Sequence, residues 1–252
     1  MKIRNEAVLV TGASRGLGRA LSQALVKEGA RVVMVARGER DLETAVREIR
    51  AELPRDGGQV HGLAFDVGDK ESVHKLTGAA AALVGPIGIV VHDASTLGPV
   101  PMPLLMDTAC EDFERVLAVN LVGPFRLTKV LAGPMVVKGR GLVLHMSSDA
   151  AVNAYTRWGA YGVSKAAQDH LARTFAAELD PVRFFSVDPG EMDTKMHADA
   201  LPEAERATLA RPGAVAQLLL EIIRNADSLP NGARLVASEI ATTLAVKKTE
   251  AS

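Results

Sequence analysis

Cysteine is almost absent from this chain of 252 residues, and its scarcity excludes several classes of protein. Cys110 is the only cysteine, so the sequence has no internal disulfide framework, no cysteine-based zinc site and no CxxC redox pair. The six histidines are scattered without the spacing of a zinc protease, and we expect no metal site. A lone thiol is typical of a reducing compartment, which favours a cytoplasmic location.

An excess of charge of one sign is also missing. The chain has 29 Lys and Arg against 30 Asp and Glu, so no overall field would attract nucleic acid or an anionic membrane. Long apolar runs are missing too: the most apolar window, residues 79–91, is interrupted by Gly85 and Pro86 and falls short of the roughly 18 residues of a membrane-spanning helix. The first residues lead into an apolar run too short for a signal sequence. We expect a soluble protein with a small-molecule partner.

Short apolar runs alternate with segments of helical periodicity along the chain, and 48% of the residues are hydrophobic, enough for a substantial core. The expected strands are residues 7–10, 31–36, 60–67, 87–91, 141–146, 182–187 and 232–237. The expected helices are residues 19–28, 38–53, 70–84, 107–117, 120–138, 161–179 and 212–224. This alternation predicts an α/β fold, a Rossmann-like doubly wound parallel sheet of about seven strands with helices on both faces. We expect one domain, residues 1–239, with a lid at about 191–210 and a tail at 240–252.

A glycine-rich turn joins the first expected strand to the first helix. Residues 12–18 read GASRGLG, which has the spacing GxxxGxG rather than GxGxxG or a P-loop. Glycines let backbone N–H groups approach a pyrophosphate closely, and the helix N-terminus behind them carries a partial positive charge. The turn predicts a dinucleotide phosphate site, with an ordinary tight turn as the alternative.

Charged residues follow the second and third expected strands. Arg37 stands where dinucleotide folds place an acid for the ribose 2′-OH or a base for the 2′-phosphate. Ala36 and Arg37 offer no carboxylate, and Arg15 supplies a second guanidinium, so we favour NADP(H) over NAD(H); two solvated surface arginines are the alternative. Asp66 could accept a hydrogen bond from adenine, or cap the helix that begins near Asp69.

Tyr161 and Lys165 are the candidates for proton transfer. A spacing of four residues on a helix places them on one face. A fixed positive charge lowers the pKa of a phenol from about 10, which makes it a proton donor and acceptor near neutrality. The same spacing also fits a surface Tyr and Lys pair. Tyr155 lacks such a partner, because Gly159 stands where the lysine would be needed.

These motifs, in this order over residues 6–237, resemble those of the classical short-chain dehydrogenases/reductases. Residues 11–18 resemble the cofactor turn, and Ser148 lies thirteen residues before Tyr161, the usual interval of the family, which favours it over Ser147. The resemblance implies the catalytic residues Tyr161, Lys165, Ser148 and Asn120. It implies the cofactor-binding residues Gly12, Ser14, Arg15, Gly16, Leu17, Gly18, Arg37, Asp66, Val67, Ala94, Lys165, Pro189, Gly190 and Thr194.

The resemblance implies an NADP(H)-dependent oxidoreductase that interconverts a carbonyl and an alcohol by hydride transfer. Tyr161 would donate the proton, Ser148 would stabilise the carbonyl oxygen, and Lys165 would lower the Tyr161 pKa and bind the nicotinamide ribose. Asn120 would hold a relay water, and the helices of Asn120 and Tyr161 would form a homodimer or homotetramer. Residues 157–166 and 189–196 are similar to the sepiapterin reductase subgroup, which implies a pterin side-chain ketone.

The stretch 92–95, His-Asp-Ala-Ser, departs from the Asn-Asn-Ala-Gly that the family commonly has. Ala94 matches, so a backbone contact with the cofactor ribose is retained, but the bracing side chains differ. This departure favours the main alternative, a catalytically weak NADP(H)-binding regulatory or structural protein of the same fold. The complete catalytic set argues against it. A sugar-nucleotide epimerase or dehydratase would need a longer C-terminal substrate region.

Several apolar residues stand near the expected site. Trp158 precedes Tyr161 closely enough to line the cleft, although a packed core tryptophan is the alternative. Met192 and Met196, on the expected lid, could form an adaptable apolar wall or an ordinary part of the core.

Overall fold

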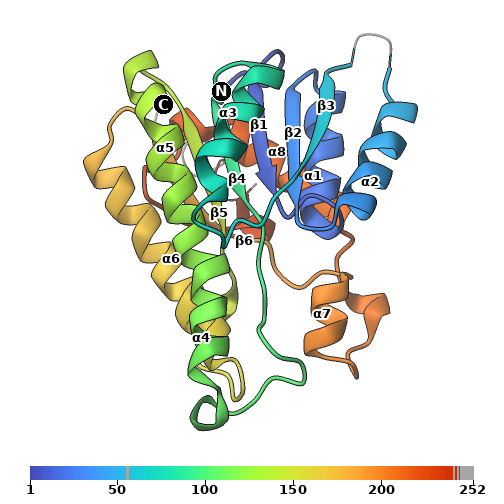
Figure 1. Ribbon diagram of the computed structural model, residues 1–252, viewed down its shortest axis with the longest axis vertical. Coiled ribbons are helices and arrows are strands. Elements are labelled where there is room, and N and C mark those ends of the chain that lie inside the picture. The colour runs from blue at the N-terminus through green and yellow to red at the C-terminus, as the bar shows by residue number, and fades with distance from the viewer. Residues whose placement is uncertain (55–56, 241, 243, 245–252) are drawn as a thin grey trace.

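One seven-stranded sheet forms the centre of the protein in a computed structural model that describes residues 1–54, 57–240, 242 and 244 (Figure 1). The strands are β1 (Ala7–Thr11), β2 (Arg31–Ala36), β3 (Gln59–Ala64), β4 (Ile89–His92), β5 (Leu142–Met146), β6 (Arg183–Asp188) and β7 (Arg234–Val236). Their order is β3-β2-β1-β4-β5-β6-β7, and every neighbouring pair is parallel. The expected doubly wound parallel sheet is confirmed.

Helices connect successive strands. The α-helices are α1 (Gly16–Lys27), α2 (Glu39–Ala51), α3 (Ser72–Val84), α4 (Cys110–Leu117), α5 (Gly123–Lys138), α6 (Gly159–Glu178), α7 (Lys195–Ala200) and α8 (Pro212–Arg224). The 3-10 turns are η1 (Leu105–Asp107), η3 (Asp149–Ala151), η4 (Arg206–Thr208), η5 (Ala226–Ser228) and η6 (Ala237–Glu239). Segment η2 (Ala118–Val122) is a π-helix.

Two hydrophobic cores cover the two faces of the sheet. Because side chains alternate along a strand, Val8 and Val10 of β1 face one core and Leu9 faces the other. The first core packs the sheet against α1, α2 and α8, and the second packs it against α3, α5 and α6. Both faces are therefore buried, which explains why the central strands consist of nearly continuous apolar residues.

One row of polar residues crosses the sheet near the C-terminal ends of its strands. The register pairs Thr11 with His92, His92 with His145, His145 with Ser186, and Ser186 with Arg234. The first four of these side chains are buried. Alternation places them on the face covered by α5 and α6, so the sheet interior is polar just beneath its functional edge.

Two buried histidines occupy the middle of that row. The His92 and His145 rings lie 4.8 Å apart between centroids, and His92 Nε2 is 2.9 Å from Thr128 Oγ1. Burial holds the pKa of His92 well below its ordinary value and lowers the pKa of His145 to about 3. Both rings are consequently neutral near pH 7, which is the form that a buried histidine can sustain.

Helices α4 and α5 are continuous through the π-helical segment, whereas the sequence predicted two separate helices. The stretch Cys110–Lys138 is long and apolar enough to cross a membrane by length and composition alone. Half of its most apolar window is buried, and α5 packs its buried residues against the second core. We therefore interpret it as a core helix.

The remaining boundaries differ from the expected ones by a few residues. Helix α6 begins two residues before Tyr161, so Tyr161 lies in its first turn, and β3 ends at Ala64, before Asp66. The expected lid, residues 191–210, contains α7 and η4. Most of the expected tail, residues 240–252, lies outside the described residues.

Candidate active site

A cavity of about 900 Å³ lies at the C-terminal edge of the sheet, next to the neighbouring ends of β1 and β4. The chain leaves these two strands toward opposite halves of the sheet, which is the switch point where such folds bind ligands. The expected residues that line the cavity are Gly12, Ser14, Arg15, Gly16, Leu17, Arg37, Asp66, Val67, Ala94 and Thr194. Its volume is in the range of cofactor sites.

The glycine turn forms the floor of this cavity because side chains would not fit there. A Cβ atom at Gly12, whose φ is +71°, would lie 2.7 Å from the backbone nitrogen of Ala94. A Cβ at Gly18 would lie 2.7 Å from Asp93 Oδ2. Gly16 has φ +57° and only the Thr194 side chain nearby, at 3.5 Å. The turn thus leaves backbone N–H groups and the start of α1 open to an anionic ligand, so the residues present fit a pyrophosphate.

Two exposed arginines stand on the cavity wall. Arg15 lies in the turn and Arg37 follows β2 directly, and both line the cavity. Ala36 beside them carries no carboxylate that would repel a phosphate. This wall is electrostatically suited to an adenosine ribose that carries a 2′-phosphate.

Asp66 has partners that the sequence did not reveal. Its Oδ2 lies 2.5 Å from Arg115 Nη2, and its Oδ1 accepts a hydrogen bond from Gly68 N at 2.8 Å. Burial raises the pKa of Asp66, but the hydrogen bonds from Arg115 and Gly68 outweigh it and hold that pKa below its ordinary value. The carboxylate lines the cavity as expected, and it forms a turn there. The hydrogen bonds expected of a cap near the start of α3 are made by Asp69, to Ser72 Oγ and Glu71 N.

Tyr161 and Ser148 meet beyond the inner end of the cavity. Tyr161 lies in the first turn of α6, is 8% exposed and hydrogen-bonds to Ser148, which follows β5. Ser148 Oγ also accepts from Ala150 N at 3.2 Å, which begins η3. Ser147 Oγ is instead 3.5 Å from the Ser148 carbonyl. The structure therefore brings Ser148, rather than Ser147, to the Tyr161 hydroxyl.

Lys165 lies on the same side of the site as Tyr161, one turn along α6. Its Nζ is 5.5 Å from the centroid of the Tyr161 ring and donates to the Met146 carbonyl at 2.6 Å. Lys165 is 2% exposed, and burial lowers its pKa to about 8, while the charges of Asp93 and Asp169 act in the opposite direction. The ammonium is thus held in place between the strand end and the helix.

The pKa of Tyr161 differs from the expectation. Burial raises it well above its ordinary value, and the negative charges of Asp93, Asp188 and Asp149 raise it further, against the hydrogen bond from Ser148. The expected lowering by Lys165 is not found, because the Lys165 ammonium is directed to the Met146 carbonyl. The Tyr161 side chain is a phenol in this structure, ready to donate a proton rather than accept one.

Asn120 lies in the π-helix and joins two parts of the site. Its Oδ1 accepts from Thr96 N, and its Nδ2 donates to Thr96 O and to Ser164 Oγ, each at 2.9 Å. All the hydrogen-bonding groups of the amide except one lone pair and no donor beyond these two are engaged. Asn120 thus fixes the loop after β4 to α6 through its side chain, a bracing role that the expected relay water did not include.

Asp93 is a functional candidate that the sequence marked only as a departure. Its carboxylate lines the cavity and accepts a hydrogen bond from the backbone of Gly18. Loss of hydration raises the pKa of Asp93 to about 7, although the Lys165 charge and the Gly18 N–H lower it. Asp93 therefore braces the glycine turn against the loop after β4, the task that differing side chains had put in question.

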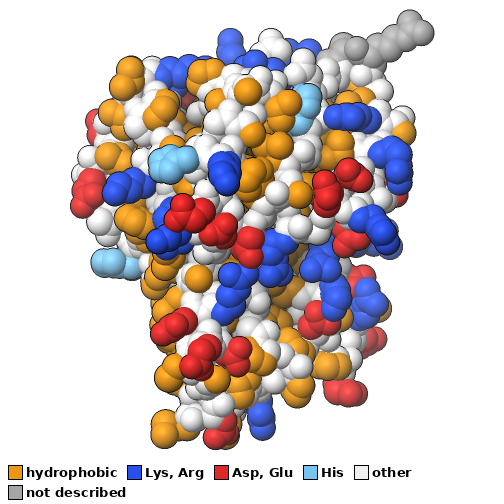
Figure 2. Space-filling view, in the orientation of Figure 1, with side chains coloured by type: hydrophobic (Ala, Val, Ile, Leu, Met, Phe, Trp, Pro, Cys, Tyr) orange, Lys and Arg blue, Asp and Glu red, His pale blue; other side chains and the backbone are white. Residues whose placement is uncertain are grey.

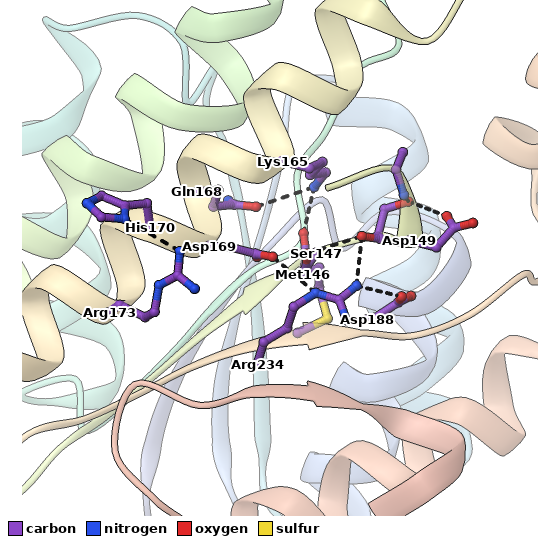
Figure 3. Close-up of polar contacts among 12 residues, drawn as sticks. Met146, Ser147, Asp149, Lys165, Gln168, Asp169, His170, Arg173, Asp188 and Arg234 are labelled. Atoms are coloured by element: carbon purple, nitrogen blue, oxygen red, sulfur yellow. Dashed lines mark hydrogen bonds and ion pairs between the residues drawn. The ribbon is translucent and has the colours of Figure 1, made fainter. Parts of the chain in front are cut away.

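Arg234 is a second residue that the sequence analysis missed. Figure 3 shows its guanidinium between Asp169 of α6 and Asp188 at the end of β6, at distances of 3.1 and 2.9 Å. It also donates to the Ser148 carbonyl at 2.9 Å. Asp188 in turn accepts from Gly190 N at 3.0 Å. One cation on β7 therefore joins the Ser148 loop, the turn after β6 and the helix of Lys165.

The segment after β6 reaches the cavity only in part. Thr194 lines it and caps α7 by accepting from His197 N at 3.3 Å. Pro189 and Gly190 lie beyond the cavity wall, as do Lys165, Ser148, Asn120, Tyr161 and Gly18, within the described part of the chain. Together, the fold and the site define a dinucleotide-binding α/β protein with a Tyr, Lys and Ser group beside the binding cavity.

Comparison with known proteins gives the family. The family model described as short chain dehydrogenase matches residues 6–205. Sepiapterin reductase of Xenopus laevis is 33% identical over 216 residues, which is 81% of each chain. L-xylulose reductase of Homo sapiens is 33% identical over 192 residues, 75% of this chain and 72% of that protein. This protein belongs to the short-chain dehydrogenase family, as the resemblance implied, and is thus an oxidoreductase of CH–OH and C=O groups.

Solved structures share the whole fold. A short-chain dehydrogenase of Escherichia coli CFT073, crystallised with NADPH, is 26% identical with a TM-score of 0.84, over 94% of this chain and 98% of that one. A xylitol dehydrogenase with bound NAD⁺ is 23% identical with a TM-score of 0.81, with the same coverage. The fold thus occurs with either nicotinamide cofactor.

Proposed function

We propose that this oxidoreductase uses NADP(H) to interconvert a ketone or aldehyde and the corresponding alcohol. The observation that carries the proposal is the hydrogen bond between Tyr161 and Ser148, with the Lys165 ammonium 5.5 Å from the phenol ring. The group lies beside a cavity whose floor is the glycine turn. Proton donor, oxyanion partner and cofactor site therefore adjoin one another.

The residues divide the chemistry between them. Bound NADP(H) supplies the hydride, which goes to the carbonyl carbon. Tyr161, kept protonated by burial, donates its proton to the carbonyl oxygen as negative charge develops there. Ser148 Oγ donates a hydrogen bond to the same oxygen. Lys165 stabilises the phenolate that remains, since its ammonium is fixed on the same side of the ring.

The choice of NADP(H) rests on Arg15 and Arg37. Both guanidiniums are exposed on the cavity wall where a 2′-phosphate would lie, and a guanidinium pairs strongly with phosphate oxygens. The NADPH complex of the related Escherichia coli CFT073 protein supports this choice. NAD(H) would be the weaker cofactor because no carboxylate is offered to its free 2′-OH.

The proposal includes a cytoplasmic homodimer or homotetramer. Cys110 is exposed, and an exposed lone thiol is stable in a reducing compartment. Helices α5 and α6 present the exposed side chains Phe125 and Val163, which would be covered in an assembly formed through these two helices.

Replacing Tyr161 tests the proposed function. We expect Tyr161→Phe to lower carbonyl-dependent NADPH oxidation by about 10²–10⁴-fold, the usual loss with a general acid. NADPH binding, followed by the fluorescence of the reduced nicotinamide, should be retained. Tyr155 is the only other tyrosine and is 46% exposed, so Tyr155→Phe is the matched control. Unchanged turnover of Tyr161→Phe would refute the assignment.

A further inference from the structure

An apolar cluster surrounds the proposed proton donor. Its buried members are Leu97, Met102, Ala150 and Tyr161, and Trp158, Met196 and Ala200 pack against it. Leu97 and Met196 also line the dinucleotide cavity. The cluster therefore begins where the cavity ends, and it brings together the loop after β4, η3, the start of α6 and helix α7. A substrate that reaches Tyr161 must lie against these side chains.

Aromatic rings give the cluster a defined shape. The Trp158 ring lies 5.6 Å from the Tyr161 ring at an angle of 73°, and Tyr155 lies 6.4 Å from Trp158 in another edge-on contact. Ring edges and faces set at such angles favour contact with a flat, unsaturated group. Met196 on α7 supplies an unbranched, adaptable side chain against the cluster.

Charge at this end of the site is negative. Residues 94–106, which supply one wall, contain no charged side chain. Asp93, Asp149 and Asp188 all act on Tyr161 with negative charge. The nearby cations are engaged: Lys195 lies 2.6 Å from Asp199, and Arg157 donates to the Met102 carbonyl at 3.2 Å. An anionic substrate would meet repulsion here.

The space-filling view agrees with this distribution. In Figure 2, Lys and Arg side chains gather across the middle of the face. The lobe below them, which contains α4, α7 and the loops beside them in Figure 1, carries hydrophobic and acidic side chains and few basic ones. The basic band suits a phosphate-bearing cofactor, and the lower lobe suits an uncharged, apolar molecule.

We propose that the substrate is an uncharged ketone or aldehyde whose carbonyl carries an aryl or similarly flat apolar group, held between Trp158 and Met196. Open-chain sugars and keto acids are disfavoured, because the cluster offers few partners for hydroxyl groups and no free cation for a carboxylate among the residues described. This inference rests on the proposed function. The carbonyl is reduced by one hydride from NADPH and one proton from Tyr161, which gives the alcohol and NADP⁺.

Three carbonyl compounds test the substrate class with the full-length enzyme and NADPH. Methyl benzoylformate and benzoylformate share an aryl ketone and differ in charge, while D-erythrulose is an uncharged polyhydroxy ketone. We expect kcat/KM for the ester to exceed that for each of the others at least about tenfold, which corresponds to one lost polar or favourable apolar contact. Faster turnover of benzoylformate or D-erythrulose would overturn the inference while leaving the proposed function intact.

Fluorescence provides a readout that does not depend on turnover. Trp158 is the only tryptophan, so the intrinsic emission reports on this cluster alone. We expect methyl benzoylformate to quench it saturably in the presence of NADP⁺, and D-erythrulose to leave it unchanged. If none of the three compounds oxidises NADPH, the proposed function fails, and the quenching still decides whether an aryl carbonyl binds beside Trp158. Absence of quenching by the ester overturns the inference.

A pair of methionine variants locates the binding. Met196→Gln introduces an amide into the cluster and should raise KM and the quenching midpoint for the ester about tenfold, with little change in kcat. Met106→Gln is the control, because Met106 is 94% exposed and outside the cluster. Equal constants for the two variants would show that the aryl group does not lie against Met196.

Discussion

Asp93 shows how one carboxylate can serve both packing and electrostatics. It occupies the space that a Cβ of Gly18 would fill, so the third glycine of the turn and the aspartate require each other. It also lies close enough to Lys165 for each charge to affect the pKa of the other. The family commonly has asparagine here, which would brace the turn without a charge. The aspartate therefore makes the site sensitive to pH.

We expect Asp93→Asn to stabilise the protein increasingly as pH rises from 5 to 7. The folded-state pKa of Asp93 is about 7 against an ordinary 3.8, so the stabilisation from its protonated form is complete below 3.8 and is lost as pH rises through 7. Asparagine mimics the protonated form at every pH. The difference in free energy of unfolding should grow by roughly 2 kcal/mol, less than full linkage because the carboxylate faces a cavity. Urea unfolding at pH 5 and pH 7 measures it, and a constant difference would contradict the raised pKa.

Arg37 determines the cofactor preference in the proposed function. Arg37→Asp removes a guanidinium from the 2′-phosphate position and adds a carboxylate suited to a ribose 2′-OH. The ratio of kcat/KM with NADPH to that with NADH should fall by about tenfold or more, the value of a charge-assisted hydrogen bond. Dissociation constants of both reduced cofactors provide the second measurement. An equal loss with both cofactors would indicate a structural role for Arg37.

At the scale of elements, Arg234 connects β7 to the two neighbouring parts of the site. Its partners Asp169 and Asp188 have side chains only 6% and 9% exposed, so removing the guanidinium leaves two buried carboxylates without a cation. Arg183 is a matched control: it is also part-buried and donates to the Ala226 and Leu229 carbonyls, but it lies at the opposite end of the strands.

We expect Arg234→Gln to lower both stability and kcat, and Arg183→Gln to lower stability alone. Loss of the buried ion pairs should cost about 3 kcal/mol in free energy of unfolding. The fall in kcat follows because the Ser148 carbonyl and the Asp188 turn lose their common partner. Thermal unfolding and initial rates, measured well below the melting temperatures, separate the two effects, with Arg234→Lys as a partial rescue. Wild-type kcat in folded Arg234→Gln would contradict the positioning role.

The elements show what sequence patterns can and cannot predict. Alternating apolar runs predicted all seven strands, because strands buried on both faces must be apolar along their length. The glycine turn and the Tyr161 and Lys165 spacing are local in sequence, so both were found. Arg234 and Asp169 are 65 residues apart and meet only through the order of the strands. The Tyr161 pKa depended on burial, which spacing does not reveal.

At the scale of the whole molecule, helices α5 and α6 present an apolar outer surface (Figure 1). Phe125 is 40% exposed and Val163 is 47% exposed. We expect the combined change Phe125→Glu with Val163→Glu to dissociate the proposed homo-oligomer, since it would place charges in a desolvated interface. Light scattering coupled to size exclusion measures the mass. Leu83→Glu, at a 40% exposed position on α3, is the control, and a mass unaffected by the double change would exclude this face.

The π-helix at Ala118–Val122 places a constraint on the length of the chain. Such a segment holds one residue more than an α-helix would over the same path. Deleting any single residue there would turn everything on one side of the gap by about 100° around the helix axis relative to the other side. Asn120 could then be kept in the sequence and still point away from Thr96 and Ser164, so this stretch should tolerate substitutions more readily than changes in length.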